Sequence, residues 1–226
     1  MKDIIYALGV FASFLVLTGC GLDNYDEPGS NLYGQITYEG EPIGLKGTGE
    51  AVQLQLYQDG YELDAPIPVY VKQDGSFEAA LFDGEYKLVT RDQNGPWINT
   101  RDTTIITVDG NAEVQLEVTP YFVPSQVSIT LTGKSLLQST FTVQQVVNDS
   151  EVDYAMLLIS KTNFVDDVVY LGRQDVRDLE IGIPIHIDLD VSDIKEVQAD
   201  NPLFARIGIR AVGADQAIYS EVVRVR

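Results

Sequence analysis

Apolar and polar residues alternate with a period of two along most of this chain, beginning at Leu32. Residues 52–57 (VQLQLY) and 127–132 (VSITLT) show the pattern in its simplest form. Because successive side chains of a strand point to opposite faces, each such segment can bury one face and solvate the other. The segments are 32–37, 52–57, 68–73, 76–81, 85–90, 103–108, 113–118, 127–132, 140–147, 154–160, 168–171, 185–189, 204–212 and 217–225. The chain is therefore predicted to be all-β, built from short antiparallel strands.

Turn signals divide the chain into two halves. Asp-Gly pairs, which tolerate the positive φ of tight turns, lie at 59–60, 74–75, 83–84 and 109–110, and none occurs later. Between the halves, Pro120 and Pro124 flank three bulky residues, which predicts a short, semi-rigid hinge with its aromatic side chains packed at the junction. We expect two tandem antiparallel β-sandwiches, at 32–119 and 120–226. One short helix is expected at 192–199, with Ser192 as its N-cap.

The N-terminus predicts export and lipidation. Lys2 precedes an apolar run over residues 4–17, which is shorter than the roughly 20 residues that span a membrane and suits a signal peptide. Leu17-Thr18-Gly19-Cys20 resembles a bacterial lipobox, so residues 1–19 are expected to be removed and Cys20 to carry lipid. Residues 20–31 are expected to form a flexible tether. Their acidic residues resemble the surface-export signal of Bacteroides-type lipoproteins, and an ordinary solvated linker is the alternative.

Charge and cysteine content restrict the partners of the chain. A net charge of −19 at pH 7 repels phosphate, which argues against nucleic acid and anionic membrane surfaces as partners. Attachment to a membrane would then depend on the lipid on Cys20. Since Cys20 is the only cysteine, a disulfide framework within the chain is excluded. Burial of apolar side chains must stabilise the fold.

Two resemblances refine the domain prediction. Residues 32–118 resemble the carboxypeptidase-regulatory-like, transthyretin-related sandwich in 34–37 (GQIT), 40–43 (GEPI), 74–77 (DGSF) and 81–88 (LFDGEYKL). Residues 125–226 are more loosely similar to a fibronectin type III sandwich, chiefly over 204–225, although the usual strand tryptophan is missing. With the lipobox and the acidic tether, the whole resembles a family of two-domain Bacteroides-type lipoproteins, domain-of-unknown-function family 3823. That resemblance implies an outer-membrane lipoprotein exposed at the cell surface, in a Sus-like (starch-utilisation-like) uptake system.

Trp97 is the main candidate for contact with a ligand. It lies in residues 91–102, the longest polar connection of the first half, together with Asn94 and Asn99. An exposed indole can stack on a sugar ring while amides bond its hydroxyls. The alternative is that Trp97 folds over the sandwich edge or meets the second domain.

The single histidine restricts metal binding. His186, Asp188 and Asp190 share one face of the strand expected at 185–189, opposite three apolar residues. We interpret this as a polar outer face, with a weak Ca²⁺ or other metal site as the alternative. No cofactor is expected.

No catalytic set is recognisable in the sequence, because phosphate loops, Cys/His metal spacing and a nucleophile elbow are missing. The acidic pairs Asp166-Asp167 and Glu39/Glu41 are interpreted as surface charges, since glycosidase carboxylates need a deep cleft. Asp102-Thr103-Thr104 resembles the short O-glycosylation motif of Bacteroides-type exported proteins. We expect a non-enzymatic accessory that binds polysaccharide or uptake-system proteins. The alternative is an adhesin-like spacer that presents a partner protein, and an enzyme with an unrecognised acidic site is a third interpretation.

Overall fold

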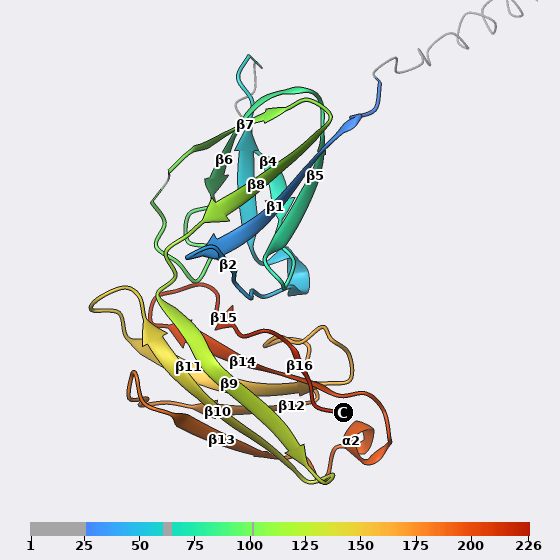
Figure 1. Ribbon diagram of the computed structural model, residues 1–226, viewed down its shortest axis with the longest axis vertical. Helices are drawn as coiled ribbons and strands as arrows, with labels where there is room; N and C mark the ends of the chain where they lie inside the picture. Colours follow the sequence, from blue (N-terminus) through green and yellow to red (C-terminus); the bar gives the residue numbers. More distant parts are fainter. Residues whose placement is uncertain (1–25, 61–64, 101) are drawn as a thin grey trace, which may run out of the picture.

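The structure, a computed structural model, describes residues 26–60, 65–100 and 102–226. These residues are almost all strand and loop, and they form two β-sandwiches placed end to end (Figure 1). The signal peptide, Cys20 and most of the tether expected at 20–31 lie outside the described residues. In the described ranges, no helix has the length and apolar character needed to cross a membrane.

The first sandwich contains two sheets. One holds β1 (Ser30–Tyr38), β2 (Glu41–Pro42), β5 (Ser76–Leu81) and β8 (Asn111–Glu117). The other has the order β4 (Ile67–Tyr70), β3 (Gln53–Tyr57), β6 (Gly84–Thr90) and β7 (Thr104–Val108). A 3-10 turn, η1 (Thr48–Glu50), precedes β3. The Asp-Gly pairs at 59–60, 74–75 and 109–110 lie between consecutive strands and have a positive φ at glycine, as predicted. In the fourth pair, Gly84 is the first residue of β6 and its φ of 158° is close to extended.

The second sandwich also has two sheets. The three-stranded sheet has the order β13 (Ile185–Asp190), β10 (Leu136–Gln145) and β9 (Phe122–Thr132). The five-stranded sheet has the order β12 (Gly172–Val176), β11 (Val152–Ser160), β14 (Phe204–Ala211) and β15 (Ile218–Tyr219), with β16 (Val223–Arg224) also pairing with β14. The short helix is α2 (Lys195–Gln198). The prediction of an all-β chain with two tandem sandwiches is therefore confirmed.

One strand pair departs from the antiparallel prediction. β1 and β8 run parallel, from Asn31 opposite Asn111 to Thr37 opposite Glu117. Parallel neighbours need a long connection, and the intervening strands of the first sandwich supply it. Alternation within a strand says nothing of its neighbour's direction, so the sequence pattern could not reveal this pair.

Three local predictions were wrong. Residues 168–171 form a bent, irregular segment, because the Asp166 carboxylate accepts the N–H groups of Val168 and Val169, both at 2.9 Å, and β12 begins only afterwards. Ser192 does not cap α2; its N–H and hydroxyl both donate to Asp190. Pro124 lies inside β9 and not in a hinge, and β9 tolerates it because it is an edge strand.

The two hydrophobic cores are continuous. Buried apolar side chains of both sandwiches belong to one cluster, with Trp97 from the first domain and Phe122 from the second among its members. The connection between β8 and β9 is short, and the N–H of Tyr121 donates to the carbonyl of Pro96 at 3.0 Å. As expected, aromatic residues pack at the junction.

Candidate functional site

The indole of Trp97 does not face solvent. It is 3% exposed, its backbone forms a bridge with Pro120, and its Nε1 finds no acceptor among the described residues. A Cβ on Gly95 would lie 2.3 Å from the indole, which shows how closely the loop wraps the ring. The interpretation of Trp97 as an exposed sugar platform is therefore wrong, and the alternative of packing at the domain junction holds.

Asn94 and Asn99 hold the same loop in place. Asn94 accepts the N–H of Gln53 at 2.5 Å and donates to the carbonyl of Ala51 at 2.7 Å. Asn99 accepts the hydroxyl of Thr90 at 2.7 Å and donates to the carboxylate of Asp92. Both amides already have partners within the protein, so neither is positioned to recognise a ligand in this conformation.

His186, Asp188 and Asp190 lie on the outer face of β13, and the alternation predicted for this strand is correct. Nδ1 of His186 lies 3.0 Å from the hydroxyl of Thr140. Asp188 accepts a long bond from Gln138, and Asp190 bonds Ser192. Across the described part of the chain, no group of three metal-ligating side chains is assembled. The outer face of β13 is a hydrogen-bonded polar surface.

The two acidic pairs differ in how far they are exposed to solvent. Glu39 and Glu41 are exposed, in agreement with the interpretation as surface charges. Asp166 is only 1% exposed, so that interpretation is wrong for it. Its carboxylate accepts the N–H of Thr48 at 2.9 Å as well as the hydroxyl of that residue, which belongs to the first domain. Asp166 is thus a buried link between the domains.

Arg206 of β14 is the centre of this interdomain joint. The guanidinium is 1% exposed and donates to four backbone carbonyls from both domains. The acceptors are Leu45 and Gln73 in the first domain and Val165 and Ser220 in the second, at 2.7 to 3.1 Å. Burial lowers the pKa of Arg206 to about 10, which still leaves it charged at neutral pH. A rigid, planar donor set of this kind fixes both domains to one side chain.

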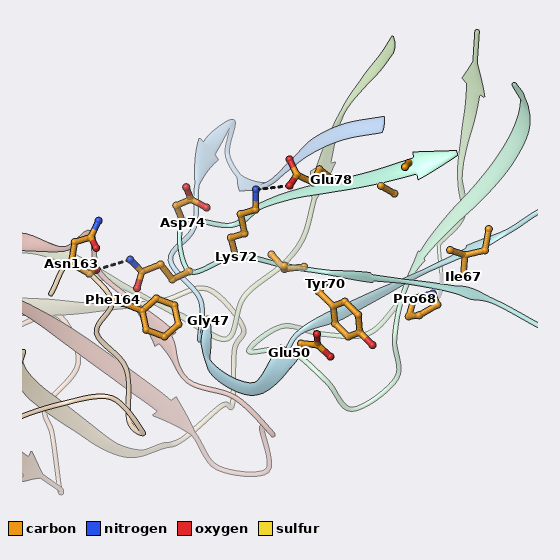
Figure 2. Close-up of a pocket in the computed structure, with 14 residues that line it drawn as sticks. Gly47, Glu50, Ile67, Pro68, Tyr70, Lys72, Asp74, Glu78, Asn163 and Phe164 are labelled. Carbon is orange, nitrogen blue, oxygen red and sulfur yellow. Dashed lines mark hydrogen bonds and ion pairs between the residues drawn. The ribbon is translucent and has the colours of Figure 1, made fainter. Parts of the chain in front are cut away.

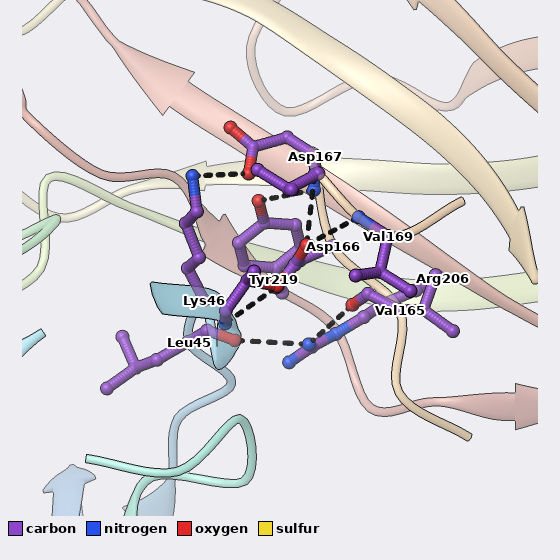
Figure 3. Close-up of polar contacts among 10 residues, drawn as sticks. Leu45, Lys46, Val165, Asp166, Asp167, Val169, Arg206 and Tyr219 are labelled. Atoms are coloured by element: carbon purple, nitrogen blue, oxygen red, sulfur yellow. Dashed lines mark hydrogen bonds and ion pairs between the residues drawn. The ribbon is translucent and has the colours of Figure 1, made fainter. Parts of the chain in front are cut away.

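Further contacts extend the joint, as Figure 3 shows. Arg206 stacks 4.5 Å from the ring centroid of Tyr219. Lys46 of the first domain pairs with Asp167 of the second at 2.9 Å. A Cβ on Gly44 would lie 2.4 Å from Nη2 of Arg206, so only glycine permits the close approach of this segment. The joint is therefore a packed, hydrogen-bonded interface and not a flexible linker.

Beside the joint, a groove of about 670 Å³ runs along the open edge of the first sandwich. We call it the junction groove. Its lining comes from residues of 67–74 and 78–80, from Gly47 and Glu50 before β3, and from Asn163 and Phe164 of the second domain. β4 and β5, the edge strands of the two sheets, meet there. The groove thus combines an edge of the first sandwich with a loop of the second.

Tyr70 supplies an accessible aromatic surface in the junction groove. Its side chain is 39% exposed, and Ile67 on the same strand is also 39% exposed. Figure 2 draws Tyr70 and Pro68 on one side of β4, with Ile67 and an ion pair between Lys72 and Glu78 on the other. An aromatic ring beside paired charges is an amphipathic surface that suits a ligand with apolar and hydroxyl faces.

Gln73 connects the groove to the joint. Its Nε2 donates to the carbonyl of Asn163 at 2.6 Å, and its Oε1 accepts the N–H of Val165 at 3.2 Å. The same residue offers its own carbonyl to Arg206 at 3.0 Å. Contacts between Gln73 and the second domain therefore fix one end of the groove. The sequence reasoning missed this groove, and the tyrosine and proline on a strand edge were the available signal.

Comparison with known proteins identifies both halves of the chain. Residues 30–119 match the description "Protein of unknown function (DUF3823) N-terminal domain", and residues 122–224 match "Domain of unknown function (DUF3823_C)". A search of curated proteins finds no match.

Solved structures from Parabacteroides and Bacteroides species share the fold of this chain. A DUF3823 family protein from Parabacteroides merdae is 50% identical, has a TM-score of 0.85, and is matched over 89% of this chain and 100% of its own. A DUF3823 family protein from Bacteroides ovatus is 28% identical, with a TM-score of 0.79 over 87% of this chain and 100% of its own. A Bacteroides uniformis protein, provisionally described as carbohydrate binding, shares the fold at 17% identity, with a TM-score of 0.74 over 88% and 99%. With its two domains matched in order over most of its length, this chain belongs to the DUF3823 family.

Proposed function

We propose that this protein is a non-enzymatic, lipid-anchored accessory of a Sus-like nutrient uptake system, and that it binds polysaccharide in the junction groove. The observation that carries the proposal is Tyr70, a residue 39% exposed in a groove with charged side chains on its walls. The flat face of tyrosine can stack on the C–H face of a sugar, and the carboxylates of Glu50 and Glu78 can accept hydrogen bonds from the sugar hydroxyls.

The charge of the protein selects among polysaccharides. A net charge of −19 disfavours polyanionic polymers, including nucleic acid, through long-range repulsion. In the groove itself Lys72 is paired with Glu78 at 3.2 Å, so this cation is already compensated. Neutral glycans are therefore the ligand class that fits best.

The relatives support the choice of ligand class only in part. The Bacteroides uniformis neighbour is provisionally described as carbohydrate binding, and at 17% identity its likeness extends to the fold alone. The proposal retains a transthyretin-like first domain and a fibronectin type III-like second domain. Sandwiches of both kinds serve widely as binding or spacing modules.

The placement of the ends suits an anchored protein. β1 starts at the end of the first domain that lies away from the second (Figure 1). A nine-residue strand is about 30 Å long, so the groove would stand about that far above the point where the tether enters. Lipid on Cys20 would then hold the protein at the outer membrane, exposed at the cell surface, with its groove facing outward past the headgroups.

Calorimetry with neutral polysaccharides tests the proposal. The native protein should bind at least one member of a panel of starch, xylan, mannan and laminarin, and Tyr70→Ala should weaken that binding about tenfold or more. Tyr170→Ala is the matched control, because Tyr170 is 43% exposed in the second domain and does not line the groove. No binding of the native protein to any member of the panel, or an equal loss of affinity in both variants, would contradict the proposal.

The rigid joint around Arg206 favours one second candidate. A protein whose domains are fixed end to end can serve as a spacer that presents a partner at the outer membrane. Pull-down with the intact lipoprotein separates the candidates. Capture of a stable protein partner, together with no binding to any glycan, would favour the spacer.

A further inference from the structure

Strand register places a second tyrosine on the same sheet face as Tyr70. Tyr70 of β4 lies directly opposite Gln53 of β3. Gln53 and Tyr57 are an even number of residues apart, so their side chains point the same way. Leu54 and Leu56 between them are 0% exposed, which identifies the opposite face as the one turned to solvent. Both tyrosines therefore lie on the outward face of this sheet.

The neighbouring strand continues this polar surface. Val89 of β6 lies opposite Gln55, and Arg91 follows two residues later with the same orientation. Nη1 of Arg91 donates to Oε1 of Gln53 at 2.6 Å. The outer face, defined here as Gln53, Gln55, Tyr57, Val89 and Arg91, thus carries amide and guanidinium groups beside the rings of Tyr57 and Tyr70.

This face is hollowed and adjoins the junction groove. A depression of about 400 Å³ is lined by Gln55, Tyr57 and Val89, with Arg91 and its two neighbours at one end. Gln55 is directly opposite Pro68, which lines the junction groove. Side chains opposite each other on antiparallel strands lie about 5 Å apart. The groove and the depression are therefore neighbouring parts of one surface.

We propose that the ligand path continues from the junction groove across the outer face to Tyr57, so that the site takes an extended stretch of neutral polysaccharide. This inference rests on the proposed function of the groove. Gln53 and Tyr57 are four positions apart on β3, about 13 Å at the rise of a strand, which is longer than one sugar ring. Tyr70 and Tyr57 then stack on different sugars of one chain, and the amide of Gln55 donates to a hydroxyl between them.

A chain-length series tests the inference by calorimetry. The probes are maltose and maltohexaose, xylobiose and xylohexaose, mannobiose and mannohexaose, and laminaribiose and laminarihexaose. Tyr57→Ala should weaken hexasaccharide binding about tenfold and leave disaccharide binding unchanged, whereas Tyr70→Ala should weaken both. Arg91→Ala, at an exposed side chain, is a second variant that should reproduce the length-dependent loss if Tyr57→Ala fails to fold.

The outcomes separate the two proposals. Loss of hexasaccharide affinity in Tyr70→Ala, with wild-type affinity in Tyr57→Ala and Arg91→Ala, would overturn the extended path and leave the groove intact. An equal loss for disaccharide and hexasaccharide in Tyr57→Ala would also overturn it. Absence of binding by the native protein to any of the eight probes would overturn both proposals.

Discussion

Replacing Arg206 by methionine tests whether one side chain holds the two domains together. Methionine keeps most of the volume and removes every donor, so the carbonyls of Leu45, Val165 and Ser220 lose their partner. The carbonyl of Gln73 also loses Arg206 but keeps the N–H of Leu45 at 2.9 Å. A buried polar group left unpaired costs about 1–3 kcal/mol, so three such carbonyls give a gross loss of about 3–9 kcal/mol. Removing the cation recovers part of the desolvation cost that lowers its pKa to about 10. Water entry recovers more, and we expect a net loss of about 3–5 kcal/mol.

Urea unfolding followed by two probes measures this loss. Fluorescence of Trp97 reports on the junction, because it is the single tryptophan and is buried there. Circular dichroism reports on both sandwiches. The two transitions should coincide in the native protein, where the cores are continuous, and should separate in Arg206→Met as the domains uncouple.

Arg210→Met is the matched control for charge and strand position. Arg210 lies on β14 with the same orientation as Arg206, and it is only partly buried. Its replacement removes the same charge and should change the free energy of unfolding by no more than about 0.5 kcal/mol. A loss below about 1 kcal/mol in Arg206→Met, or an equal loss in both variants, would refute the reasoning.

Three further predictions concern Asp166 and Trp97 at the junction. Burial alone would raise the pKa of Asp166, but hydrogen bonds from Thr48 and from the turn at 168–169 lower it overall. Its stabilising effect is therefore complete above about pH 4 and is lost as the pH falls through the lowered pKa. The difference in unfolding free energy between the native protein and Asp166→Asn should shrink from pH 6 to pH 3, and a constant difference would contradict this. Trp97→Ala should cost about 3–5 kcal/mol in urea unfolding, because a large core side chain is lost. Trp97→Phe should leave glycan affinity unchanged in calorimetry. A loss of that affinity without a loss of stability would contradict this and show that Trp97 contributes to ligand binding.

Local patterns in the sequence predicted the strands and their inward faces well. Val52, Leu54 and Leu56 were expected to point inward, and each is 0% exposed. This succeeds because the direction of a side chain on a strand depends on position parity, which the chain carries locally. The Asp-Gly pairs succeeded for a similar reason, since φ is a property of one or two residues.

The candidate site could not be predicted in the same way. Asp166 looks like a surface charge until the fold brings Thr48 to it from 118 positions away in the sequence. Trp97 sits in a polar loop, and its burial depends on the junction around Pro120. Tyr70 acquires Gln53 as a neighbour on one side of β3, and Gln53 meets Arg91 on the other side, only through strand pairing.

The sequence by itself thus determined the class of fold, the division into two halves and the expected anchor at Cys20. Only the tertiary structure decided that the domains form a fixed joint around Arg206 and that a groove opens beside it. The physical reason is the distance along the chain over which each interaction acts. Alternation and turn formation act between adjacent residues, whereas burial of a charge and the shape of a groove depend on segments that meet only after folding.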